Sequence, residues 1–233
     1  MNNYPPYYDP ARFEQGGASL ATRVSQVMKR VYIKMFLGLL VTAFVALGCQ
    51  SSPAVIHFFI TNSWSMWVLI AVAISGAINR LSSAAATGLF FLFAVVNGLM
   101  LFPIFMVYAP DSIAKTFFIT AGGFGAMSIY GYSTSQDLTK WGSFLVMALI
   151  GLIIASLVNI FLHSSTMDWI ISGAGVLIFI GLTAWDTQTI KRMAQAAPAE
   201  STGKLATIGA LNLYLDFINL FLYLLRFFGN SRD

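Results

Sequence analysis

Residues 209–226 read GALNLYLDFINLFLYLLR, and this stretch decides how the rest of the chain is arranged. Small or polar residues recur in it at spacings of 3, 4, 3, 4 and 3, which places them on one face of a helix. These positions are Gly209, Asn212, Asp216, Asn219, Tyr223 and Arg226. A polar stripe of this length cannot face lipid, because unsatisfied polar groups in hydrocarbon are costly. The stripe therefore predicts a helix at the centre of a bundle.

The whole composition indicates a polytopic membrane protein. Only 9% of the 233 residues are charged, whereas about 25% is typical of soluble domains. The stretches between charges are long enough to cross a hydrocarbon core ~30 Å thick. We expect an all-α membrane protein with seven transmembrane helices. The predicted spans are residues 33–50, 64–80, 84–108, 113–132, 141–162, 168–187 and 206–228.

The spans form a single domain over residues 31–230, preceded by a polar arm. The arm covers residues 1–30. Its start, residues 2–10 (NNYPPYYDP), lacks the positive start and the apolar core of a signal peptide and is interpreted as a disordered tail. Residues 19–34 are expected to form a short amphipathic helix before the membrane. Its basic residues would meet anionic lipid headgroups. They are Arg23, Lys29, Arg30 and Lys34.

Basic residues predict the orientation of the chain. Ten lie on the side of the N-terminus and three on the opposite side, as the spans divide them. Because basic loops stay in the cytoplasm, the N-terminus is expected in the cytoplasm and the C-terminus outside.

Small residues in the fourth predicted span indicate close packing. Residues 120–126, TAGGFGA, contain two overlapping small-xxx-small pairs, which let helix backbones approach one another. The alternative interpretation is a glycine-lined permeation path.

Three residues place charge inside the apolar spans, where charge is costly and therefore indicates function. They are Asp186, Asp216 and Arg226, and Arg80 lies at a span boundary. Asp186, Asp216 and Arg80 can meet near the cytoplasmic side. Asp216 is the deeper aspartate by span counting, so the two meet only if the last helix begins before Gly209. Arg226 has no expected acidic partner, so it either snorkels to headgroups or lines an outer vestibule.

Two chemistries remain open for a buried aspartate pair. Two carboxyl groups in a low-dielectric site titrate as a unit and can form a proton switch, and when ionised they offer hard oxygen ligands to a transient Ca²⁺. Alternatively, both aspartates form salt bridges with Arg80 that only join helices. Intramembrane aspartyl proteolysis is disfavoured, because Leu213-Tyr214-Leu215-Asp216 lacks the Gly-x-Gly-Asp pattern.

Other function classes find no support in the sequence. No dense Lys/Arg run with interleaved aromatics suggests nucleic acid. Cys49, His57 and His163 are isolated, so neither a metal cluster nor Cys–His catalysis is expected. We expect no enzyme activity and no cofactor, and the lipid bilayer and Ca²⁺ as partners.

Three segments carry a resemblance to a known family. Residues 181–188 (GLTAWDTQ) and 209–221 (GALNLYLDFINLF) closely resemble the transmembrane Bax-inhibitor-motif family. Residues 124–132 (FGAMSIYGY), running on to Asp137, resemble the same family's span-four signature. The ending at residues 226–230 resembles the bacterial branch, which implies the inner membrane of a bacterial cell as the location.

The resemblance implies a fold and a function. Six helices are expected to wrap, as two three-helix layers, around the central C-terminal helix. Family members are associated with a pH-sensitive Ca²⁺ leak, in which Asp186 and Asp216 would be the proton sensor and Arg80 would latch the closed state by pairing with Asp186. Some bacterial members restrain a membrane protease. The resulting hypothesis is a calcium leak channel, and the alternative is a non-transporting regulator of a membrane protease or another stress-response partner.

Overall fold

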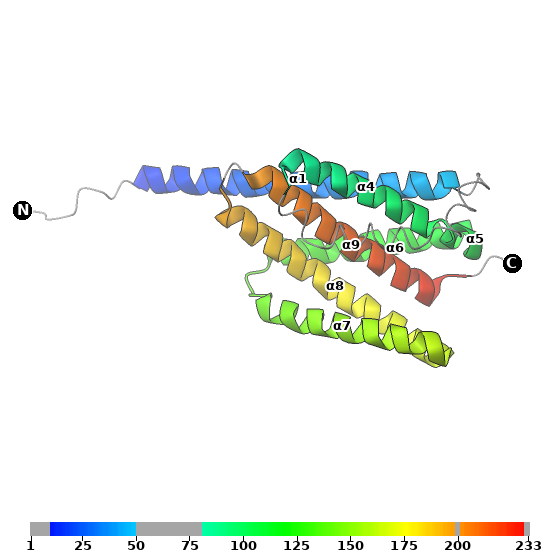
Figure 1. Ribbon diagram of the computed structural model, residues 1–233. Coiled ribbons are helices and arrows are strands. Elements are labelled where there is room, and N and C mark those ends of the chain that lie inside the picture. The colour runs from blue at the N-terminus through cyan, green and yellow to red at the C-terminus, as the bar shows by residue number, and fades with distance from the viewer. Residues whose placement is uncertain (1–9, 50–80, 199–200, 231–233) are drawn as a thin grey trace, which may run out of the picture.

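The computed structural model describes residues 10–49, 81–198 and 201–230, and the side chains from Ser19 onwards. Every element in these ranges is a helix, and none is a strand (Figure 1). The helices are α1 (Pro10–Cys49), α4 (Ser83–Leu101), α5 (Ile104–Val107), α6 (Pro110–Ser133), α7 (Thr139–Leu162), α8 (Ser165–Ala196) and α9 (Thr202–Phe228). The predicted span 64–80 and Arg80 lie outside the described residues.

Local sequence explains where several helices begin and end. Ser82 and Ser164 cap α4 and α8, because their hydroxyl oxygens accept hydrogen bonds from the first turn of each helix. Pro103, which has no backbone N–H, separates α4 from α5 within the predicted span 84–108. Pro110 at the start of α6 has a backbone shape suited to a first helical position.

Helix α1 corrects the prediction for the N-terminal arm. The helix runs unbroken from Pro10 to Cys49, so residues 19–34 are part of one long helix and not a separate short helix before the membrane. The predicted disordered tail, residues 2–10, lies outside the described residues except for Pro10. No proline follows Pro10 until after Cys49, and therefore nothing in the backbone interrupts the helix. Its first half also packs into the core along one face, formed by Val24, Val27, Met28 and Val31.

Five described helical segments are long and apolar enough to cross a membrane, namely Ser19–Cys49, Ser83–Val107, α7, α8 and α9. The predicted span 113–132 corresponds to α6, which is as long as α7 but less apolar and is not among them. The structure therefore supports a membrane protein. The prediction of seven spans in two layers includes the span 64–80, outside the described residues.

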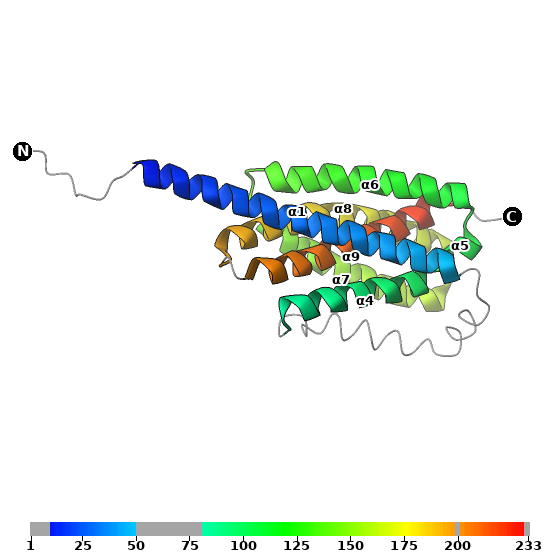
Figure 2. The ribbon, with the colours of Figure 1, turned by 90° about the horizontal axis from the view of Figure 1, so that it is seen from above.

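The last helix lies at the centre, as its polar stripe predicts. Helix α9 packs against α1, α4, α6 and α8 (Figures 1 and 2). In the apolar 18-residue stretch that could cross a membrane, 67% of α9 is buried, against 44% of α8 and 11% of α7. The leucines and aromatics on its other faces are buried as well, because neighbours surround it on several sides. We call the end of the bundle at which α8 finishes and α4 and α9 begin the basic end.

Candidate functional site

Asp186 on α8 and Asp216 on α9 are brought together in the core. Their carboxyl groups are hydrogen-bond partners, and the Asp216 side chain is buried with 5% exposure. Atom Oδ2 of Asp216 has no hydrogen-bond donor among the described residues. Neither carboxyl group has an ion pair with a basic side chain in the described ranges. In this site Asp216 is buried and Asp186 is half-buried, and each carboxyl group has the other as its main polar neighbour.

The packing of α8 on α9 determines this register. A Cβ added at Gly209 would lie 3.1 Å from the Ile190 side chain, and one added at Gly175 would lie 2.6 Å from the Tyr223 ring. These close contacts bracket the aspartates along two helices of opposite direction. Helix α9 also begins at Thr202, before Gly209, which is the condition under which the two aspartates could meet.

The geometry allows one kind of proton chemistry. Two ionised carboxylates are both acceptors, so a hydrogen bond between them requires a proton on one of them. Two like charges in a buried site are also unfavourable, and a shared proton removes one of them. The site can therefore hold and release a proton as a unit. In its ionised form it presents oxygen atoms of the type that Ca²⁺ prefers.

Two buried hydroxyls, one on α6 and one on α8, were missed by the sequence analysis. The Oγ atom of Ser128 on α6 and the Oγ1 atom of Thr187 on α8 have no hydrogen-bond partner among the described residues. Thr187 follows Asp186 directly. Ser128 lies one turn beyond Phe124, whose ring packs 5.4 Å from that of Phe217 on α9. A small hydroxyl inside an otherwise apolar span is the signal that could have identified both.

The remaining members of the polar stripe differ in their roles. The side chain of Asn219 donates a hydrogen bond of 2.8 Å to the Leu215 carbonyl of its own helix. Tyr223 stacks on Phe179 of α8, with 5.8 Å between ring centres, and Asn212 is half-buried. These residues serve mainly to pack α9 against its neighbours and to satisfy its polar groups locally.

Arg226 has an acidic partner, which corrects the prediction that it has none. Its guanidinium donates to the carboxylate of Asp168 in the first turn of α8. The same Asp168 oxygen accepts a 2.7 Å hydrogen bond from the Asn159 amide. The partner was missed because Asp168 was assigned to a span end, whereas the opposite directions of α8 and α9 bring that end beside Arg226.

Two basic side chains of α1 bind protein groups, which corrects their assignment to lipid headgroups. The Lys34 ammonium donates hydrogen bonds of 2.8 Å to Thr87 on α4 and 2.6 Å to Thr207 on α9. Arg23 donates to the Gln195 carbonyl of α8. Because α1 packs into the core at this level, one of its polar faces meets other helices and not the membrane surface.

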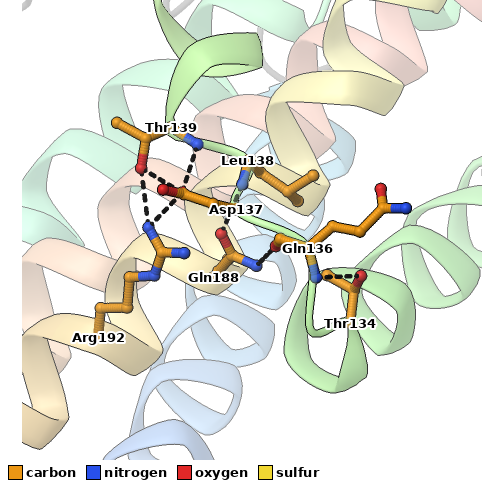
Figure 3. Close-up of polar contacts among 7 residues, drawn as sticks. All are labelled: Thr134, Gln136, Asp137, Leu138, Thr139, Gln188 and Arg192. Carbon is orange, nitrogen blue, oxygen red and sulfur yellow. Dashed lines mark hydrogen bonds and ion pairs between the residues drawn. The ribbon is translucent and has the colours of Figure 1, made fainter.

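At the basic end, α8 holds the segment between α6 and α7 (Figure 3). The Gln188 side chain accepts from the Leu138 N–H at 2.9 Å and donates to the Gln136 carbonyl at 2.7 Å. Arg192 donates to Asp137 at 2.7 Å. The Thr139 hydroxyl and backbone N–H, followed by Arg192, hold the pKa of Asp137 well below its usual range. This clamp, which the sequence analysis did not identify, begins two residues after Asp186.

The glycines of residues 120–126 do not mark a close helix contact, so that prediction is wrong. A Cβ added at Gly122, Gly123 or Gly125 would meet nothing within 4 Å. The close approach occurs further along α6, where a Cβ at Gly131 would collide with the Ala184 carbonyl of α8. Helix rotation explains the difference, because these three glycines do not point at the helices that α6 packs against.

Comparison with known proteins finds a matching family model and similar bacterial proteins. The family model described as "Inhibitor of apoptosis-promoting Bax1" matches residues 24–233. The inner membrane protein YbhL of Escherichia coli K12 is 48% identical over 214 residues, which cover 88% of this chain and 92% of YbhL. An uncharacterized protein of Borreliella burgdorferi is 46% identical over 217 residues, covering 90% of this chain and 94% of that protein.

Proposed function

This chain belongs to the Bax inhibitor-1-like family of membrane proteins, and on that premise we propose that it is a pH-sensitive calcium leak channel. Asp186 and Asp216 share a proton and form the sensor, and Ca²⁺ is the permeant ion. The channel acts without enzyme activity or a resident cofactor. The name of YbhL, an inner membrane protein, supports the bacterial inner membrane as the location. The excess of basic residues on the N-terminal side supports an N-terminus in the cytoplasm and a C-terminus outside.

The burial of Asp216 beside the half-buried Asp186 is the observation that carries the proposal. Asp216 is 5% exposed and its hydrogen-bonding neighbour is Asp186. A change in the proton count of this pair changes the net charge between α8 and α9. Such a change favours a different packing of the two helices, as in other elements that switch through local charge. Arg80 would latch the closed state by pairing with Asp186.

Calcium uptake by proteoliposomes tests the proposal. We expect wild-type protein to give a flux that varies between about pH 5 and pH 8, because two adjacent carboxyl groups in a low-dielectric site titrate as a unit. Asp216→Asn and Asp186→Asn should each flatten that variation, because an amide cannot share a titrating proton. Asp111→Asn is the matched control, since Asp111 is an exposed carboxylate paired with Lys115. A flux no greater than that of protein-free liposomes at any pH would overturn the channel proposal.

A second candidate function is a regulator that restrains a membrane protease without transport. It is favoured by α7, which packs mainly on α8 and leaves a broad apolar face exposed to lipid or to another protein. That face includes Ile150, Ile154, Leu157 and Phe161. Under this function, Asp216→Asn should leave the degradation rate of a membrane-protease substrate in cells at the wild-type value. Charged substitutions on the α7 face should change that rate.

A further inference from the structure

Helices α1 and α6 run side by side, with α9 behind them (Figure 2). Side chains of these three helices line a long groove. It consists of two cavities of about 810 Å³ and 540 Å³, and both are lined by Leu39, Phe117 and Phe217. The larger cavity extends along α1 from Ser25 to Leu39, a length of ~21 Å at ~1.5 Å per residue. It lies towards the basic end, and the smaller cavity lies towards the opposite end.

Glycine keeps the larger cavity open. Gly125 and Ala121 of α6 line it, and a Cβ added at Gly125 would meet nothing within 4 Å. Its lips are apolar and accessible, with exposures of 58% for Phe36 and 71% for Ile129. In a protein that spans a bilayer, such lips face the hydrocarbon of the membrane.

The positive charge of the groove is concentrated at its basic end. The lining of the larger cavity includes Lys29, Tyr32 and Tyr132 near the basic end and no acidic residue. The Lys191 ammonium lies 4.8 Å above the centre of the Tyr132 ring, which adds a second cation at this point. Lys29 forms no ion pair or hydrogen bond with the part of the chain that the structure describes. The lining of the smaller cavity carries no charged residue.

We propose that the larger cavity binds an anionic phospholipid from the leaflet at the basic end. One acyl chain lies between α1 and α6, over Phe124 and Phe217, and the phosphate meets Lys29 and the Lys191–Tyr132 pair. The cations at one end and the apolar walls along the rest match the order of headgroup and chain in a lipid. Basic side chains at this depth attract anionic lipids, and a cavity of this size is in the usual range for small ligands, ~300–1,000 Å³.

Photolabelling of the full-length protein in phosphatidylcholine vesicles tests this site. The probe is phosphatidylglycerol with a photoreactive group in one acyl chain, and labelled peptides are identified by mass spectrometry. We expect label on α1 around Phe36 and on α6 around Ile129. Unlabelled phosphatidylglycerol should displace it severalfold more effectively than phosphatidylcholine.

Two substitutions and a control sharpen the test. Gly125→Leu fills the cavity and should reduce the groove label severalfold, whereas Lys29→Ala should reduce the preference for phosphatidylglycerol. Gly151→Leu is the matched control on α7, because a Cβ at Gly151 also meets nothing within 4 Å but lies outside the groove lining. This control should leave the groove label unchanged.

Four results would overturn the proposal. Equal labelling of all exposed helix faces, or groove label that survives Gly125→Leu, would show ordinary solvation by lipid. Equal displacement by phosphatidylcholine would remove the anionic headgroup from the assignment. A photoreactive amino acid at Ile129 that links two copies of the chain would assign the groove to a second protomer.

Discussion

Lys34 on α1 donates a hydrogen bond of 2.6 Å from its ammonium group to the hydroxyl of Thr207 on α9. It also donates to Thr87 on α4, so one cation joins three helices. Thr207 lies nine positions before Asp216 on the same helix. The bond therefore fixes the central helix at its basic end, while the aspartate pair lies ~13 Å further along it.

Replacement of Lys34 by methionine should destabilise the bundle. Lys34→Met keeps the length of the side chain but removes both hydrogen bonds, and a bond from a charged donor contributes ~1.5–3 kcal/mol. The loss should be at the lower end of that range, because Thr87 and Thr207 can still bond to each other, at 3.0 Å. Denaturant unfolding in detergent measures it. Lys140→Met, at an exposed position, should leave the free energy of unfolding unchanged; an equal loss in both variants would contradict this role of Lys34.

Two glycines of α6 should respond in opposite ways to alanine. Gly131→Ala places a Cβ against the Ala184 carbonyl, so α6 and α8 must separate and the thermal unfolding temperature should fall strongly. A Cβ added at Gly123 meets nothing within 4 Å. Because alanine has a higher helix propensity than glycine, Gly123→Ala should stabilise the folded protein by up to ~1 kcal/mol. Thermal unfolding of both variants compares them directly. Equal sensitivity at the two positions would contradict the rotation of α6 described above.

Removal of two different buried hydroxyls should change the free energy of unfolding by different amounts. Thr42 bonds both the Ala94 carbonyl at 2.9 Å and the Tyr214 hydroxyl at 2.6 Å, so Thr42→Val leaves buried polar groups without a partner. Its expected cost is ~1–3 kcal/mol. Ser128→Ala removes a buried hydroxyl that has no described partner, and it should leave the free energy of unfolding equal or higher. Denaturant unfolding of the two variants checks this order, and a large loss for Ser128→Ala would reveal a bound group at that hydroxyl.

The ion pair of Arg226 and Asp168 should contribute little. Both side chains are nearly half exposed, at 45% and 43%, and exposed pairs typically contribute ~0.2–1 kcal/mol. A double-mutant cycle of Arg226→Met and Asp168→Asn measures the coupling between them. Lys115 and Asp111, at 75% and 68% exposure, form the comparison pair and should couple still more weakly. A coupling of several kcal/mol at Arg226 would contradict a partly solvated pair.

Asp137 should make the stability depend on pH. Hydrogen bonds from Thr139 and then Arg192 lower the pKa of Asp137. A carboxyl whose pKa is lowered on folding stabilises the protein above its unfolded value of ~3.9, and that contribution is lost as pH falls towards the folded value. Asp137→Asn should therefore lower the unfolding temperature near neutral pH, with a difference from wild type that narrows below about pH 4. A difference in unfolding temperature that does not change with pH would contradict this role of Asp137.

The sequence alone determined the features that follow from local geometry. Side-chain spacing on a single helix predicts which residues share a face, and the cost of polar groups in lipid then requires residues 209–226 to be covered by other helices. The central position of α9 confirms this reasoning. The membrane class follows from composition in the same way, since the apolar spans need no knowledge of their neighbours.

Only the tertiary structure decided which side chains meet. Whether Arg226 finds Asp168, whether Lys34 faces lipid or Thr207, and whether Gly125 touches a helix or lines a groove all depend on the rotation and relative height of separate helices. A shift of one residue turns a helical side chain by ~100°, so the sequence pattern of one helix cannot define its contacts with another. The packing of α8 and α9 around Gly175 and Gly209 supplies that register, and it brings Asp186 to Asp216.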